Sequence, residues 1–126
     1  MDGQFKIPAT DKTPSIIFHD GFLEIKGRGL LEEHIGFWAD AIKAIKENII
    51  DNVNPLVTDF KIKLELEYLN SASSAAILSI MRMFENYPVP VKVLWHYEWD
   101  DEDMKEFGED YEALVDLPFE FFSKES

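Results

Sequence analysis

The sequence predicts a mixed α/β fold, in which a sheet of about five strands carries three helices in the order β-β-α-β-α-β-α-β. Several runs alternate apolar and polar residues, which is typical of half-buried strands. Others place apolar residues on one helical stripe, and the two kinds of segment take turns along the chain. Because crossovers between parallel strands are right-handed, we expect parallel pairing beside an antiparallel hairpin. A chain of 126 residues should form one domain, over residues 1–126.

The first predicted strands form a hairpin. Residues 1–13 are expected to be a loose arm, and ordered structure should start at Thr13, because a residue before proline favours extended backbone. Residues 15–19 and 22–26 are rich in apolar side chains and flank Asp20-Gly21. An Asp-Gly pair between two such runs indicates a tight type I′ turn.

A helix is predicted next, from about Glu32 to Asn48. Its apolar residues fall on one stripe at helical spacing, namely Phe37, Trp38, Ala41, Ile42, Ile45 and Ile49. Asparagines and a proline between residues 51 and 55 then indicate a turn.

The clearest strand pattern runs from residue 58 to residue 69. It has strict period two, so that one face of the strand should be buried and the other solvated. The predicted buried face carries Phe60, Ile62, Leu64, Leu66 and Tyr68, and the solvated face carries Lys61, Lys63, Glu65 and Glu67. Small hydroxyl residues follow this strand directly and precede a second helical pattern.

The remaining elements alternate again. The second helix is expected over about 73–86, where Pro88 ends it. A strand over 91–99 follows. The aspartates within 100–103 should cap a third helix, because carboxylates accept hydrogen bonds from the free N–H groups of a first turn. Residues 118–122 form the last predicted strand.

The composition limits the partners and the compartment. The net charge is −13, from 25 acidic and 12 basic residues, which argues against nucleic acids and anionic membranes as partners. There is no cysteine and no signal-like or membrane-spanning segment, so a cytoplasmic protein is predicted. Acidic residues concentrate within 98–116, where only Lys105 is basic. This run is either a solvated face or a docking surface for a basic partner.

The sequence gives no positive sign of a metal, a cofactor or catalysis. His19, His34 and His96 lie in different elements without ligand spacing, and the acids of 100–103 lack the spacing of a calcium loop. Neither a phosphate-binding glycine loop nor a Gly-x-Ser-x-Gly elbow is present. The nearby aromatic residues Trp95, Tyr97 and Trp99 are expected to pack in the core and at the sheet edge.

The hydroxyl residues after the clearest strand admit two roles. Ser71 could accept hydrogen bonds from the backbone as a helix cap, although Asn70 is equally suited to that role. It could also accept a phosphate, since the N-terminus of a helix stabilises negative charge. Ser73 and Ser74 are alternative acceptors, and their preferred interpretation is as ordinary residues of the first helical turn.

Several motifs together resemble the SiaC family of bacterial regulatory phosphoproteins, and they extend over nearly the whole chain. The most specific is the run from Leu66 to Ser74, with its Tyr-Leu-Asn-Ser core. The others are Ile7-Pro8-Ala9-Thr10 with Thr13-Pro14, the hairpin with the helix after it, the strand Val93–Tyr97, Gly108-Glu109-Asp110 and Pro118-Phe119.

The resemblance implies a fold and a switch. Members of this family are similar in fold to the STAS domains of anti-sigma-factor antagonists. The resemblance implies that a partner kinase phosphorylates the Ser/Thr after Tyr-Leu-Asn, which is Ser71 here. It also implies that a serine/threonine phosphatase removes the phosphate. The unphosphorylated form would bind a diguanylate cyclase or a related regulator, which favours biofilm growth. The implied partner-binding residues are Tyr68, Leu69, Asn70, Ser71, Ala72, Ser73 and Ser74. We expect the surface to continue along the exposed face of the next helix, and to include Arg82 if that side chain points outward.

Two other functions remain open at this point. STAS-like folds can hold nucleotides or lipids, so a small-ligand-binding module is the alternative, and an apolar pocket with convergent polar groups would favour it. A hydrolase that uses clustered acids has no motif in its favour. The prediction is therefore a non-enzymatic binding protein that needs no cofactor.

Overall fold

The computed structural model describes residues 5–29 and 35–125. Its elements follow in the order β1 (Phe5–Ile7), β2 (Ser15–His19), β3 (Phe22–Gly29), α1 (Ile35–Ile45), the π-helical segment η1 (Lys46–Ile50), β4 (Phe60–Leu69), α2 (Ser71–Met83), β5 (Val91–Glu98), α3 (Glu102–Leu114) and β6 (Phe119–Lys124).

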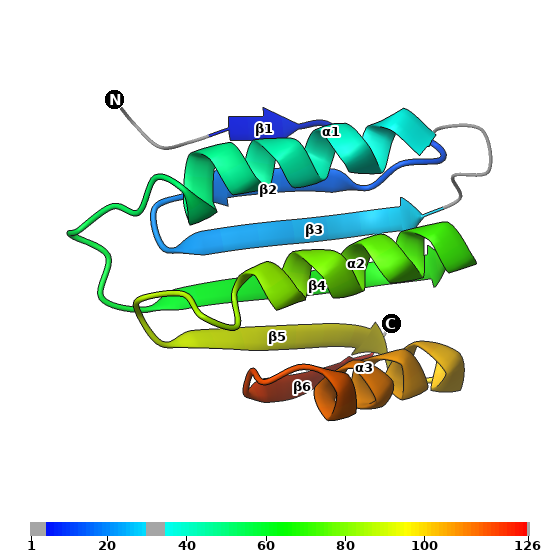
Figure 1. Cartoon of the computed structure of the whole chain (residues 1–126). Helices are drawn as coiled ribbons and strands as arrows, with labels where there is room; N and C mark the ends of the chain where they lie inside the picture. Colours follow the sequence, from blue (N-terminus) through cyan, green and yellow to red (C-terminus); the bar gives the residue numbers. More distant parts are fainter. Residues whose placement is uncertain (1–4, 30–34, 126) are drawn as a thin grey trace.

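One six-stranded sheet organises the chain, with the spatial order β1-β2-β3-β4-β5-β6. β1, β2 and β3 pair antiparallel, whereas β3, β4, β5 and β6 pair parallel. Each parallel connection carries one helix, and Figure 1 shows α1, α2 and α3 side by side on the same face of the sheet. The mixed α/β class is confirmed, and the apolar side chains of the sheet are buried under this single helical layer.

The sixth strand, β1, corrects the predicted count of about five strands and, over residues 5–7, the prediction of a loose arm. Phe5 and Ile7 are half-buried, and the ring of Phe5 lies 5.6 Å from that of Phe18 on β2. Three residues are too few for an alternating pattern to be recognised in a sequence. The strand is held by its pairing with β2 and not by its own propensity.

The helix ends differ from the predicted ones by a few residues. The predicted start of the first helix at Glu32 lies outside the described residues, and that helix continues through η1 as far as Ile50. α2 begins two residues earlier than the predicted Ser73 and ends at Met83. α3 begins after its cap, Asp101, whose side chain accepts a hydrogen bond from the Met104 N–H at 3.0 Å.

The prediction that Tyr68 lies on the buried face of β4 is wrong. The strand pairs Gly27 with Leu66 and then Arg28 with Tyr68, so Glu67 is an additional residue in β4, as in a β-bulge. Beyond the bulge the alternation is reversed: Leu69 is buried, whereas Tyr68 is 51% exposed. The bulge therefore turns an aromatic side chain outward directly before α2.

Trp95 on β5 is the largest fully buried side chain, and α3 is shaped to fit against it. Its indole Nε1–H donates a hydrogen bond to the carbonyl oxygen of Met104 at 3.0 Å. A Cβ atom at Gly108 would lie 2.5 Å from this Nε1 and 2.8 Å from the ring of Phe121. Gly108 is thus the residue that lets α3 approach the sheet.

Gly108→Ala should therefore lower the free energy of unfolding by about 1–3 kcal/mol through overpacking, despite the better helix propensity of alanine. Urea denaturation followed by circular dichroism measures the change. The matched control is Gly36→Ala in α1, where an added Cβ would meet no atom within 4 Å. Equal stabilities of the two variants would show that α3 packs differently.

Candidate functional site

Ser71 is the first residue of α2, and its side chain is exposed at the turn that follows β4. The helix cap is Asn70, whose Oδ1 accepts a hydrogen bond from the Ser73 N–H at 2.8 Å. The Asn70 carbonyl also accepts from the Ser74 N–H at 2.9 Å. Within the part of the chain that the structure describes, the Ser71 hydroxyl has no hydrogen-bond partner. Asn70 fills the capping role, so the Ser71 hydroxyl is left available to solvent.

The other two hydroxyl groups of this turn are engaged with neighbouring helices. Ser73 is fully buried, and its Oγ accepts a hydrogen bond from Trp38 Nε1–H of α1 at 3.0 Å. The Tyr111 hydroxyl of α3 donates to the Ser74 carbonyl at 2.8 Å and lies 3.2 Å from Ser74 Oγ. Burial raises the pKa of Tyr111, which keeps the phenol protonated as a donor.

These contacts fix the first turn of α2 from both sides. α1 reaches it through Trp38, α3 reaches it through Tyr111, and β4 leads into it through the buried Leu69. A protein partner or enzyme that approaches from solvent therefore meets Ser71 on a preformed surface.

The structure divides the seven predicted partner-binding residues by accessibility. Tyr68, Ser71 and Ala72 are exposed, Asn70 and Ser74 are half-buried, and Leu69 and Ser73 are buried. The buried pair can support the site but cannot contact a partner directly. Arg82 is exposed and lies 3.6 Å from Glu85, eleven residues after Ser71 on the same helical stripe. That separation is about 16 Å along the helix axis.

Trp99 is a surface residue that the sequence interpretation placed in core or edge packing. It follows the carboxyl end of β5 and is 57% exposed, so it projects at the same edge of the sheet as Tyr68 and Ser71. Exposed aromatic side chains are typical anchors of protein interfaces. The feature of the sequence that could have indicated its exposure is its position just beyond the strand, next to a run of acidic residues.

Three lysines of the opposite, helix-free face of the sheet are already paired. Lys26, Lys63 and Lys124 all lie within 3.8 Å of the Glu65 carboxylate, and Lys63 also contacts Glu24. Partial burial works against ionisation of Glu65, but the hydrogen bond from Lys124 and the nearby lysines lower its pKa overall. These lysines are therefore not a free site for a phosphate group.

Groups of three or more side chains suited to metal binding do not occur among residues 5–29 and 35–125. The helices in this part of the chain are also too short or too polar to cross a membrane.

Asn70→Ala should lower the free energy of unfolding by about 0.5–2 kcal/mol, because the cap of α2 would be lost. Ser71→Ala serves as the neighbouring control and should change the stability by less than about 0.5 kcal/mol. Urea denaturation of both variants makes the comparison. A larger loss of stability for Ser71→Ala than for Asn70→Ala would show that the Ser71 hydroxyl caps α2 and is therefore not available to solvent.

The described architecture is that of a small α/β binding domain that presents a serine at the start of a helix. The model of the SiaC family of regulatory phosphoproteins matches residues 7–124. The chain therefore belongs to the SiaC family, as its motifs predicted.

Two solved structures from Pseudomonas aeruginosa are similar over nearly the whole chain. One is the diguanylate cyclase SiaD in complex with its activator SiaC, where the match has a TM-score of 0.79, 26% identity, and covers 95% of this chain and 99% of that chain. The other is SiaC itself, with a TM-score of 0.78, 25% identity, and 96% and 98% coverage. An uncharacterised protein of P. aeruginosa (strain UCBPP-PA14) is 29% identical over 118 residues, which are 90% of each chain.

Proposed function

We propose that this chain is a non-enzymatic binding protein whose affinity for a partner is controlled by phosphorylation of Ser71. One observation carries the proposal: of the three serines at the start of α2, only Ser71 is exposed, while Ser73 and Ser74 are bonded to α1 and α3. A kinase needs such an accessible hydroxyl. The family membership of the chain supports a regulatory phosphoprotein.

A phosphate on Ser71 would change the surface strongly. It adds about −1.5 to −2 charges at neutral pH, next to the exposed Tyr68 and Ala72. Within an interface that charge would be desolvated and would oppose binding unless an arginine of the partner met it. The unphosphorylated chain is therefore the proposed binding-competent form.

The proposed target is a diguanylate cyclase, because the similar SiaC of P. aeruginosa is the activator of one. A protein kinase and a serine/threonine phosphatase complete the switch, which is proposed to operate in the cytoplasm, where kinases find their nucleotide substrates. Trp99 and Tyr68 would be the aromatic anchors of the interface, since both are exposed at the edge where Ser71 lies.

The deciding experiment measures the affinity of the chain for the diguanylate cyclase of the same organism by isothermal titration calorimetry. We expect phosphorylation at Ser71 to weaken binding at least about tenfold, which is about 1.4 kcal/mol. Trp99→Ala should weaken binding similarly, and the exposed Glu112→Ala on α3 serves as a control of unchanged affinity. Equal affinity of the two phosphorylation states would contradict the proposed control.

A further inference from the structure

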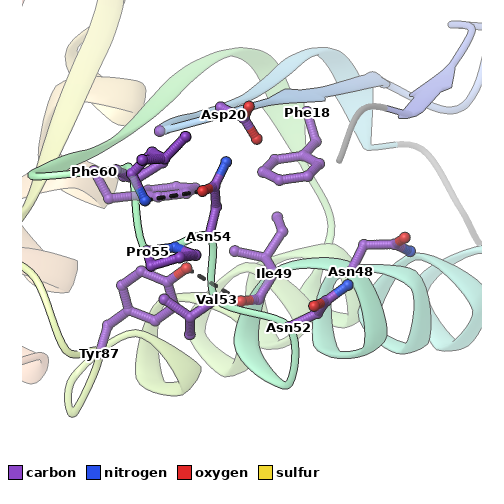
Figure 2. A pocket seen from close by; sticks show the side chains of 13 residues that line it. Phe18, Asp20, Asn48, Ile49, Asn52, Val53, Asn54, Pro55, Phe60 and Tyr87 are labelled. Atoms are coloured by element: carbon purple, nitrogen blue, oxygen red, sulfur yellow. Dashed lines mark hydrogen bonds between the residues drawn. The ribbon is translucent and has the colours of Figure 1, made fainter. Parts of the chain in front are cut away.

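A cavity of about 380 Å³ lies at the end of the molecule opposite Ser71. Figure 2 shows Phe18, Asp20, Asn54 and Tyr87 around it. It sits at the amino end of β4, whose ten residues separate it from the Ser71 turn by about 30 Å. A volume of this size is within the range of small-molecule sites in proteins.

Aromatic rings form the inner wall of the cavity. Phe60 is buried, stacks on Phe18 with centroids 6.4 Å apart, and meets the ring of Tyr87 edge-on at 5.5 Å. The Tyr87 hydroxyl donates to the Ile49 carbonyl at 3.1 Å, and burial raises the pKa of this phenol, so the ring stays neutral and fixed. The wall therefore offers rigid apolar surface with electron-rich faces.

Oxygen acceptors lie around the mouth. Asn48 uses its amide N–H to donate to the Ala44 carbonyl at 2.8 Å, which leaves its Oδ1 as an acceptor. Asn52 is exposed at the rim, and the Asp20 carboxylate forms no ion pair with any residue that the structure describes. All residues that line the cavity are neutral or acidic, and the nearby Lys46 is bound to Asp51 at 2.7 Å.

Two further features of the cavity are relevant to binding. Leu56 belongs to its rim and is 86% exposed, the most exposed large apolar side chain in the described part of the chain. An occupant would give this side chain an apolar partner. The wall from Asn48 to Ile49 is part of η1, and π-helical turns occur often at functional sites.

We propose that this cavity binds a small organic cation, a primary amine that carries an aromatic or branched apolar group. The ammonium group lies at the mouth, where the Asp20 carboxylate accepts its hydrogen bond. The apolar group packs against Phe18 and Tyr87, whose ring faces also attract the cation. The sequence left open a function as a small-ligand-binding module, and this cavity gives that function a definite location and ligand class. The proposal does not depend on the Ser71 switch.

The test is a titration of the ¹⁵N-labelled full chain, followed by amide chemical shifts. The three probes share a phenyl ring and carry a cationic, a neutral and an anionic end group: 2-phenylethylamine, 2-phenylethanol and phenylacetate. We expect the amine to shift the amides of Gly21, Val53 and Leu56 and to bind at least about tenfold more tightly than the alcohol. Phenylacetate should bind most weakly, because the Asp20 carboxylate would repel it and no basic residue lines the cavity.

The turn is not the predicted type I′, which needs a positive φ at both central residues, because only Gly21 has a positive φ, of 78°. Asp20→Asn keeps the turn intact, since asparagine has the shape of aspartate and is equally common in turns. It should reduce the affinity for the amine about tenfold and leave the affinity for the alcohol unchanged. Asp11→Asn makes the same charge change in the exposed loop between β1 and β2, at the other end of the sheet, and should have no effect. The proposal is overturned if the acid binds as tightly as the amine, if Asp20→Asn leaves amine binding unchanged, or if the amine shifts none of these amides.

Discussion

Trp95→Ala should lower the free energy of unfolding by about 3–5 kcal/mol, a large part of the 5–15 kcal/mol that stabilises a typical domain. The side chain is 1% exposed and lies between the sheet and α3. Its removal would leave a cavity lined by Gly108 and the ring of Tyr111, whose centroid lies 5.5 Å away, and would remove the hydrogen bond from the indole to the Met104 carbonyl. Urea denaturation followed by circular dichroism measures the loss.

Trp99→Ala is the matched control, because it removes the same side chain four residues further along. Trp99 is 57% exposed, so its replacement should change stability by less than about 0.5 kcal/mol. The two tryptophans should thus separate into one that stabilises the fold and one that is available for a partner. Similar losses for both variants would show that Trp99 packs in the core, as its sequence pattern first suggested.

The alternation of β4 shows what a sequence can predict about this fold. Phe60, Ile62, Leu64 and Leu66 are all buried, as period two requires. The pattern failed at Tyr68, because a β-bulge is set by the pairing with β3, and no local signal in the strand itself announces it. β1 was missed for a similar reason, since its pairing with β2 holds it in place.

The candidate site was only partly readable from the sequence. The position of a hydroxyl at the start of a helix follows from local pattern, and α2 begins at Ser71. That Ser73 and Ser74 are engaged depends on Trp38 and Tyr111, which lie 35 and 37 residues from the serines that they bind. Contacts between distant elements thus decide which of these three nearby serines a kinase could reach, and no short segment of the sequence contains those contacts.

The cavity at the opposite end was not predictable for the same reason. Phe18 lies on β2, Phe60 on β4 and Tyr87 in the loop after α2, and each looks like an ordinary core residue in its own segment. The antiparallel pairing of β2 with β3 and the parallel pairing of β3 with β4 bring Phe18 and Phe60 to the same end of the sheet.

Ser71→Ala should abolish phosphate incorporation by the partner kinase and leave the fold intact. The hydroxyl is the acceptor in the proposed switch, and the cap of α2 is supplied by Asn70, so little stability depends on Ser71. The variant should keep its affinity for the diguanylate cyclase, since it lacks the phosphate charge. Ser71→Asp should weaken that affinity, although one carboxylate carries less charge than a phosphate.

Incorporation of phosphate is measured with the purified kinase, and the site is mapped by mass spectrometry. Ser79→Ala is the matched control, because Ser79 is exposed on the same helix and its removal should leave incorporation at the wild-type level. A phosphate found on another residue, or equal labelling of the wild type and Ser71→Ala, would show that Ser71 is not the acceptor. Ser73 and Ser74 could then become acceptors only if the first turn of α2 opened, because Trp38 and Tyr111 hold their side chains against the neighbouring helices.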